Sequence, residues 1–152
     1  MIIEIYTDGS CNPQYQIGGW AAIIFGAGEK VVLHDHAIET THNRMELTAV
    51  IKSIEYVLKE IPNYKSIKIF TDSQYVERIP ARTERLVSKN FNTKKGKKIQ
   101  NLDLIQKLID LLNHPKIEFI KVKAHQKASE TPNYNREVDK LSRRIVRQRI
   151  DN

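Results

Sequence analysis

The sequence predicts an α/β protein: a five-stranded mixed sheet flanked by helices. Three strand-like segments follow one another near the N-terminus, and the later strand-like segments are separated by segments of helical period. Consecutive strands pair antiparallel through short turns, whereas strands separated by a helix can pair in parallel. We therefore expect an antiparallel meander of three strands, with the later strands parallel to the first. A length of 152 residues fits a single domain spanning residues 1–152.

The first half of the chain changes from strand period to helix period. Apolar residues alternate over residues 2–7, and residues 19–25 and 30–38 read as two further strands joined by a Gly-Ala-Gly-Glu turn. From residue 43 to residue 60 the apolar residues recur every three or four positions, which predicts an amphipathic helix. Pro62 and Asn63 are expected to end it.

The second half alternates between strands and helices. We expect a strand over residues 67–71, a short helix over residues 73–79 that Pro80 ends, and an apolar helix over residues 102–112. Residues 116–123 alternate as a fifth strand, and residues 136–150 form a final helix.

Composition favours an anionic partner. The chain carries 25 Lys and Arg against 18 Asp and Glu, and this net charge of +7 suits nucleic acid. The single cysteine, Cys11, permits no intrachain disulfide and indicates a reducing compartment, so we expect a cytoplasmic protein. The N-terminus does not read as a signal peptide, and no apolar run approaches the roughly 20 residues of a membrane span.

Two segments share one pattern: IEIYTD (residues 3–8) and IKIFTD (residues 67–72). If these are parallel neighbouring strands, Asp8 and Asp72 lie side by side where ligands bind α/β sheets. Two close carboxylates repel unless a cation lies between them, and oxygen ligands favour Mg²⁺ or Mn²⁺. Alternatively, Asp8 is an ordinary turn residue before Gly9, and Asp72 an ordinary helix N-cap.

Two further acidic residues have structural alternatives of the same kind. Glu46 could close a capping box with Asn43 at the start of the predicted helix. Asp139 could form surface ion pairs with Arg136 and Arg143, which lie three residues before it and four after it.

Five segments resemble, in the same order, the motif series of type 1 ribonuclease H: YTDGSCNP (6–13), THNRMEL (41–47), FTDSQY (70–75), VKAH (122–125) and NREVDKL (135–141). The resemblance spans nearly the whole chain and implies the ribonuclease H-like fold in a stand-alone catalytic domain. It implies an endonuclease that cuts the RNA strand of RNA–DNA hybrids and leaves 5′-phosphate and 3′-hydroxyl ends.

The resemblance also implies a metal site. Four carboxylates match the family's ligands for two Mg²⁺ ions, for which Mn²⁺ can substitute: Asp8, Glu46, Asp72 and Asp139. By this match Asp8 bridges the metals, Asp139 holds the metal beside the attacking water, and Glu46 and Asp72 hold the other. His125 matches a loop histidine implicated in proton transfer or product release. A solvent-exposed loop histidine is its alternative.

Further positions match substrate contacts. Asn12, Asn43 and Gln74 match residues that touch the hybrid near the scissile bond, and their amides can read base edges and 2′-hydroxyls. Thr41 matches a DNA-phosphate contact, but Glu39 stands where some relatives have an arginine, which puts the full phosphate pocket in doubt. Asn135 is expected to support Asp139 from one helical turn away.

The segment 82–98 occupies the place of the family's basic protrusion, which grips the hybrid. We expect phosphate contacts there from Lys89, Lys94, Lys95, Lys97 and Lys98. A solvated lysine-rich loop is the alternative, and the segment lacks tryptophan. Two more departures are Ala124, where a glycine is usual, and a longer loop between His125 and Asp139.

Two other functions stay open. One is a related nuclease that also cuts double-stranded RNA, and the other is a hybrid- or RNA-binding protein without activity. Retained carboxylates at all four positions favour an enzyme. The resemblance further implies a monomer with no obligatory protein partner.

Overall fold

The structure is a computed structural model that describes residues 1–114, 116–124 and 133–151. Its elements, in chain order, are β1 (Ile2–Asn12), β2 (Ile17–Gly26), β3 (Glu29–Ala37), α1 (His42–Glu60), β4 (Ser66–Thr71), α2 (Gln74–Glu77), α3 (Ile79–Ser88), α4 (Leu102–Leu111), β5 (Ile117–Lys121) and α5 (Tyr134–Asp151). Among the described helices, none is long and apolar enough to cross a membrane.

The five strands form one mixed sheet in the order β3-β2-β1-β4-β5. β1 and β2 are antiparallel, as are β2 and β3, whereas β4 is parallel to both β1 and β5. The predicted meander and the predicted parallel strands are thus confirmed. β1 is the central strand and pairs with β2 on one side and β4 on the other.

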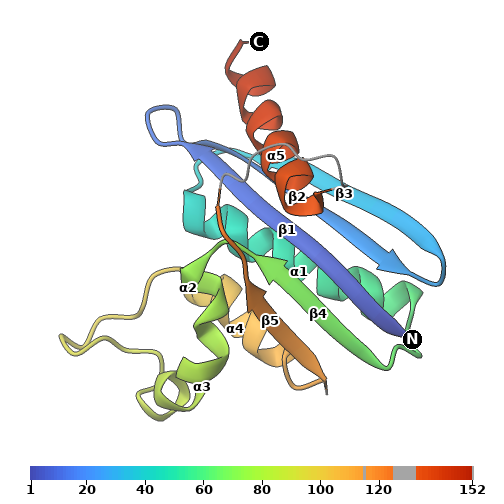
Figure 1. Cartoon of the computed structure of the whole chain (residues 1–152). Coiled ribbons are helices and arrows are strands. Elements are labelled where there is room, and N and C mark those ends of the chain that lie inside the picture. Colours follow the sequence, from blue (N-terminus) through green and yellow to red (C-terminus); the bar gives the residue numbers. More distant parts are fainter. Residues whose placement is uncertain (115, 125–132, 152) are drawn as a thin grey trace.

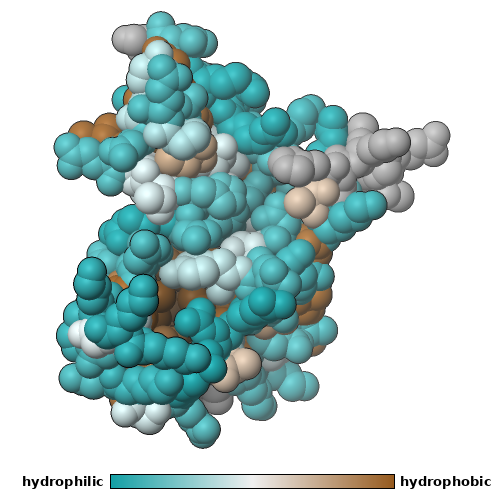
Figure 2. Space-filling model, turned by 90° about the vertical axis from the view of Figure 1, so that its left-hand side faces the viewer, coloured by the Kyte–Doolittle hydropathy of each residue, from teal (hydrophilic) through white to brown (hydrophobic). Residues whose placement is uncertain are grey.

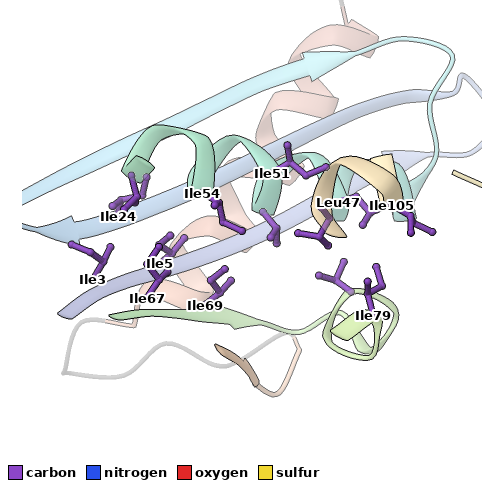
Figure 3. Close-up of a cluster of buried hydrophobic side chains, with 14 of the residues drawn as sticks. Ile3, Ile5, Ile24, Leu47, Ile51, Ile54, Ile67, Ile69, Ile79 and Ile105 are labelled. Atoms are coloured by element: carbon purple, nitrogen blue, oxygen red, sulfur yellow. The ribbon is translucent and has the colours of Figure 1, made fainter. Parts of the chain in front are cut away.

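Helices cover both faces of the sheet (Figure 1). One face packs against α1, where the alternating isoleucines of β1 and β4 meet a row of α1 side chains (Figure 3): Ile3, Ile5, Ile67 and Ile69 against Leu47, Ile51 and Ile54. Alternate residues of the two strands and residues three or four apart on α1 thus form this core together. The other face packs against α5, where Val138 is buried with Ala21 and Ile23.

The short helix α2 ends at Glu77, before Pro80, but the helix that follows it was not predicted. A second helix, α3, begins at Ile79 with Pro80 in its first turn, where a missing backbone N–H leaves no intrahelical hydrogen bond unmade. α3 buries Ile79 and Leu86 and turns its polar residues to solvent. The first part of the basic segment 82–98 is therefore helical, and the rest is an irregular excursion closed by one bridge between Asn92 and Lys98.

β1 is also longer than predicted, and this changes how Asp8 is held. The β1–β4 pairing ends at Tyr6 and Phe70, but β1 continues to pair with β2 as far as Asn12. Asp8 therefore lies inside a strand, opposite Ala21, rather than in a turn. Only one of its two neighbouring strands extends past it, which leaves the other side of Asp8 facing the end of β4.

Candidate metal centre and nucleic-acid site

Parallel pairing brings Asp8 and Asp72 together. Tyr6 and Phe70 are register partners, and each is followed two residues later by an aspartate. Side chains two residues apart on a strand share a face, so Asp8 lies on the face of Tyr6, which α5 covers. Asp72 follows β4 directly. The N-cap of α2 is Ser73, whose Oγ accepts from the Val76 N–H at 3.1 Å, so Asp72 is not the cap.

Glu46 joins the aspartates from the start of α1. Thr41 caps α1 by accepting from the Arg44 N–H at 3.3 Å, so Glu46 is not needed for a capping box with Asn43. The helix lies directly on β1, because a Cβ at Gly9 would be 2.5 Å from the Glu46 nitrogen. This close approach places the buried Glu46 side chain beside the two aspartates.

The three carboxylates form a tight, electrostatically strained cluster. One oxygen from each of Asp8, Glu46 and Asp72 lies within 4.8 Å of the other two. Burial, followed by repulsion from Glu46 and Asp72, raises the pKa of Asp8 well above its usual range. Burial, followed by repulsion from Asp72, likewise raises the pKa of Glu46. A divalent cation bound among these carboxylates would offset their mutual repulsion.

The hydrogen bonding of the cluster points the same way. Asp8 Oδ1 accepts from the Gly9 N–H at 2.9 Å, but neither oxygen of Glu46 accepts a hydrogen bond within the described chain. The His42 Nε2 lies 3.3 Å from Glu46 Oε1, close enough for an ion pair when the imidazole is protonated. A buried carboxylate with so few partners is costly, and three clustered carboxylates are the donor set that Mg²⁺ and Mn²⁺ prefer. The residues therefore fit such an ion.

Asp139 lies on α5, beside the cluster rather than within it. Its side chain is 14% exposed, and its Oδ2 is 3.7 Å from Nη1 of Arg143. Asp139 lines the same cavity as Asp8 and Asp72 and adds to the rise of the Asp8 pKa. The α5 face of the sheet thus supplies a fourth carboxylate to one wall of the site.

A cavity of about 320 Å³ opens over the carboxylates. It brings together several of the residues singled out from the sequence, namely Asp8, Asn43, Asp72, Gln74 and Asp139. Ala124 and Tyr75 also line it. Asn135 lines a smaller adjoining recess with Asp8, Asp72 and Asp139, close to where a supporting residue is expected.

Other predicted contacts lie away from this cavity. Asn12 Oδ1 accepts from the backbone N–H groups of Gln14 and Tyr15 and so shapes the turn after β1. Thr41 is occupied as the α1 cap. The five lysines of the basic segment are exposed and line no part of the cavity. His125 lies outside the described residues, so its predicted role stays a prediction.

The start of α4, which follows the basic segment in the chain, is tied to α1 and to Tyr75 of the cavity. Arg44 Nη1 and Nη2 donate to the two carboxylate oxygens of Asp103 at 2.9 and 2.8 Å. The Asn101 side chain then donates to the Tyr75 hydroxyl at 3.1 Å. Figure 2 views this end of the molecule, where the surface around the site and the basic segment is predominantly hydrophilic.

Several residues that line the cavity were given no role in it from the sequence, among them His42 and Arg143. His42 was given no role, although it directly precedes Asn43 in the first turn of α1. Arg143 was considered as a surface ion-pair partner of Asp139 and, with the other basic residues of the final helix, as part of either an extended basic face or a solvated helix face. Its spacing from Asp139 places both residues on one side of α5. That spacing was the available signal.

Comparison with known proteins gives a consistent result. The RNase H family model matches residues 2–147. Ribonuclease H of Caldicellulosiruptor saccharolyticus is 33% identical over 150 residues, covering 96% of this chain and 97% of the relative. Ribonuclease H of Methylobacillus flagellatus is 37% identical over 125 residues, covering 82% and 80%.

Solved structures share the fold. LC9-RNase H1, a type 1 RNase H with the type 2 active-site motif, superposes with a TM-score of 0.78 at 23% identity, covering 97% of this chain and 72% of that one. LC11-RNase H1 in complex with an RNA/DNA hybrid gives a TM-score of 0.70 at 18% identity, covering 97% and 99%.

Proposed function

The chain belongs to the ribonuclease H family, and from that premise we propose that it hydrolyses the RNA strand of RNA–DNA hybrids, leaving 5′-phosphate and 3′-hydroxyl ends. The observation that carries the proposal is the cluster of Asp8, Glu46 and Asp72, of which Asp8 and Asp72 line an open cavity and Glu46 is buried beside them. Holding three mutually repelling carboxylates together, two of them buried, weakens a fold, so a binding role accounts for them better than a structural one.

The carboxylates would hold two Mg²⁺ ions, or Mn²⁺ in their place, with Asp139 as the fourth ligand. Bound there, such ions supply an activated water and stabilise the entering and leaving oxygens of an in-line phosphoryl displacement. The protein's own part is to fix the four carboxylates on rigid elements: β1, the end of β4, α1 and α5. His125 is proposed to move protons or to assist product release.

The cavity walls would recognise the substrate. Asn43 and Gln74 present amides, which donate and accept hydrogen bonds and so can contact the 2′-hydroxyl that distinguishes RNA from DNA. Asn12 and Thr41, which lie outside the cavity, would contact the hybrid beside it. The exposed lysines of the basic segment would contact phosphates farther along the hybrid. All these groups come from one chain, and we propose that it acts as a monomer.

The test uses end-labelled RNA–DNA hybrid, duplex RNA and single-stranded RNA, each with Mg²⁺ or with EDTA. We expect internal cuts in the RNA strand of the hybrid, only with Mg²⁺, and no cuts by an Asp72→Asn variant. Asp35→Asn, which changes an exposed carboxylate of β3, is the matched control and should cut normally. Product ends are identified by ligation and by phosphatase treatment.

The same assay separates the two remaining candidates. Comparable cutting of duplex RNA would widen the substrate class to double-stranded RNA. Wild-type protein that binds the hybrid but cuts nothing with Mg²⁺ or Mn²⁺ would contradict the enzyme proposal and leave a binding protein.

A further inference from the structure

We propose that Arg143 positions the RNA strand by binding a phosphate in the carboxylate cavity. This inference rests on the proposed function and adds a residue to it. Of the residues lining the cavity, Arg143 is the one Lys or Arg in the described part of the chain. The other lining groups are carboxylates, amides, hydroxyls and one imidazole, which cannot supply a permanent positive charge.

The guanidinium of Arg143 lies near Asp139 but makes only a long contact with it. Its Nη1 lies 3.7 Å from Asp139 Oδ2, which is longer than the 2.7–2.9 Å of a charge-assisted hydrogen bond. The side chain is 51% exposed. Arg44 shows the contrast, since it donates two short parallel bonds to Asp103 and is fully engaged. Arg143 therefore keeps donors for an incoming anion.

Position on α5 fixes where such an anion would lie. Arg143 is one turn after Asp139, and α5 is anchored to β2 through Ser142 and Ile145, the residues on either side of it that approach Gly19. The Arg143 side chain thus starts from a rigid backbone on α5 and lines the same cavity as Asn43 and Gln74. A strand contacted by those amides would place a backbone phosphate between them and the guanidinium.

Charge gives the physical reason for a cation at this wall. A phosphodiester approaching four carboxylates is repelled until metal ions neutralise them. A planar guanidinium beside Asp139 lowers that repulsion and offers paired donors to phosphate oxygens. Arg143 is a positioning residue in this account, because it orients the strand while the carboxylates define the reacting centre.

The experiment compares Arg143→Gln, Arg143→Lys and Arg144→Gln. Arg144 is the matched control, since it is the next residue of the same helix, is exposed, and does not line the cavity. Hybrid binding is measured by fluorescence anisotropy over a series of salt concentrations, with Asp72→Asn present in every protein to block hydrolysis. Steady-state kinetics are measured in parallel in proteins that retain Asp72.

We expect Arg143→Gln to weaken hybrid binding about ten-fold and to reduce the slope of log affinity against log salt by about one phosphate contact. Arg143→Lys should restore the slope and part of the affinity, because it keeps the charge and loses the paired donors. Arg144→Gln should change neither. In the active proteins, Arg143→Gln should raise KM more than it lowers kcat.

Three results would overturn the inference. If Arg143→Gln left the salt dependence of binding unchanged, Arg143 would not contact a phosphate. If Arg144→Gln lost as much hybrid affinity as Arg143→Gln, the loss would reflect net charge and not a specific contact. A change in Mn²⁺ affinity of Arg143→Gln by calorimetry, with the salt slope unaltered, would make Arg143 only a counter-charge for Asp139. Wild-type protein that neither binds nor cuts hybrid would contradict the proposed function itself, a different outcome from loss in the variant alone.

Discussion

Tyr6 and Phe70 stack face to face across the parallel β1–β4 pair, with ring centroids 4.7 Å apart and planes 9° from parallel. They are register partners, so the stack fixes β1 against β4 two residues before Asp8 and Asp72. The shared Thr-Asp endings of the two strands thus become adjacent carboxylates. The alignment of the carboxylate cluster depends on this pairing.

Replacing Phe70 by Leu should therefore affect both stability and the site. Loss of the stack is worth about 0.5–1.5 kcal/mol beyond the apolar area that is lost. We expect a lower Tm and weaker Mg²⁺ binding in calorimetry. Phe119→Leu, on β5, removes a partly buried aromatic that packs against the α1 side of the core. It should lower the Tm while leaving Mg²⁺ affinity intact, and an equal loss of affinity in both variants would contradict the role of the stack.

Asp8→Asn should stabilise the metal-free protein, by on the order of 2 kcal/mol at neutral pH. Asp8 is 5% exposed and its pKa is raised by burial and by its acidic neighbours. The pKa of Asp8 is higher in the folded state than in the unfolded state. Its contribution to the free energy of unfolding is therefore full below the unfolded-state pKa and is lost as pH rises through the folded-state pKa. Wild-type stability should thus fall from about pH 4 towards neutral pH, and the variant should fall less.

Chemical denaturation at several pH values, with EDTA present, measures this difference. Asp35→Asn is the control and should follow the wild type. Adding Mg²⁺ should raise the Tm of the wild type, because binding to the folded state alone stabilises it, and should raise that of Asp8→Asn less. A variant that is no more stable than the wild type without metal would argue against repulsion within the cluster.

The Arg44–Asp103 pair should stabilise the junction between α1 and α4. Hydrogen bonding to Arg44 lowers the pKa of Asp103 to about 2. The pair is largely exposed, so Asp103→Asn should cost only about 0.5–1 kcal/mol. A lowered folded-state pKa gives stability that is present above the unfolded-state value and is lost as pH falls through about 2.

Urea denaturation near neutral pH and an acid titration check this prediction. Asp110→Asn, near the other end of α4, should not lose stability. If Asp103→Asn and the wild type had identical stability near neutral pH, the pair would be without energetic effect.

Gly9 should tolerate no side chain, because a Cβ there would be 2.5 Å from the Glu46 nitrogen and 2.6 Å from the Met45 carbonyl carbon. Both contacts are backbone, so relief requires α1 to move away from β1. We expect Gly9→Ala to cost about 1–3 kcal/mol or more and to weaken Mg²⁺ binding by displacing Glu46.

Gly28→Ala is the matched control. Gly28 has a φ of 76° but nothing within 4 Å of its Cβ position, so the variant should lose about 1 kcal/mol through backbone strain and keep its Mg²⁺ affinity. Normal Mg²⁺ affinity in Gly9→Ala would show that α1 does not position Glu46 through this contact.

The sequence predicted the sheet, its order of pairing and the helices on it, because hydrophobic period and turn residues report local structure directly. Pro80 was misjudged because the same residue ends one helix or begins another, and only the packing of Ile79 and Leu86 decides. β1 was cut short at residue 7 because its pairing with β2 beyond Asp8 is a long-range contact that alternation does not reveal.

The site was predictable in part for similar reasons. Asp8 and Asp72 could be placed together because parallel strands align their carboxyl ends. The position of Arg143 in the cavity wall could not be predicted from the sequence. It depends on how α5 is rotated against the sheet, and the packing of Val138, Ile145 and Val146 sets that rotation. Spacing alone left Arg143 equally compatible with a solvated face.

The most direct test of the account compares Glu46→Gln with Glu55→Gln in hydrolysis of an RNA–DNA hybrid with Mg²⁺. Both lie on α1, but Glu46 is buried in the carboxylate cluster and Glu55 is on the partly exposed side of the helix. We predict that Glu46→Gln folds, binds the hybrid and loses Mg²⁺-dependent cleavage of the RNA strand by at least about a hundred-fold, an electrostatic effect of the size that one group at a reacting centre supplies. Glu55→Gln should cleave at the wild-type rate. Cleavage by Glu46→Gln at that same rate would contradict the claim that the buried carboxylates form the catalytic metal site.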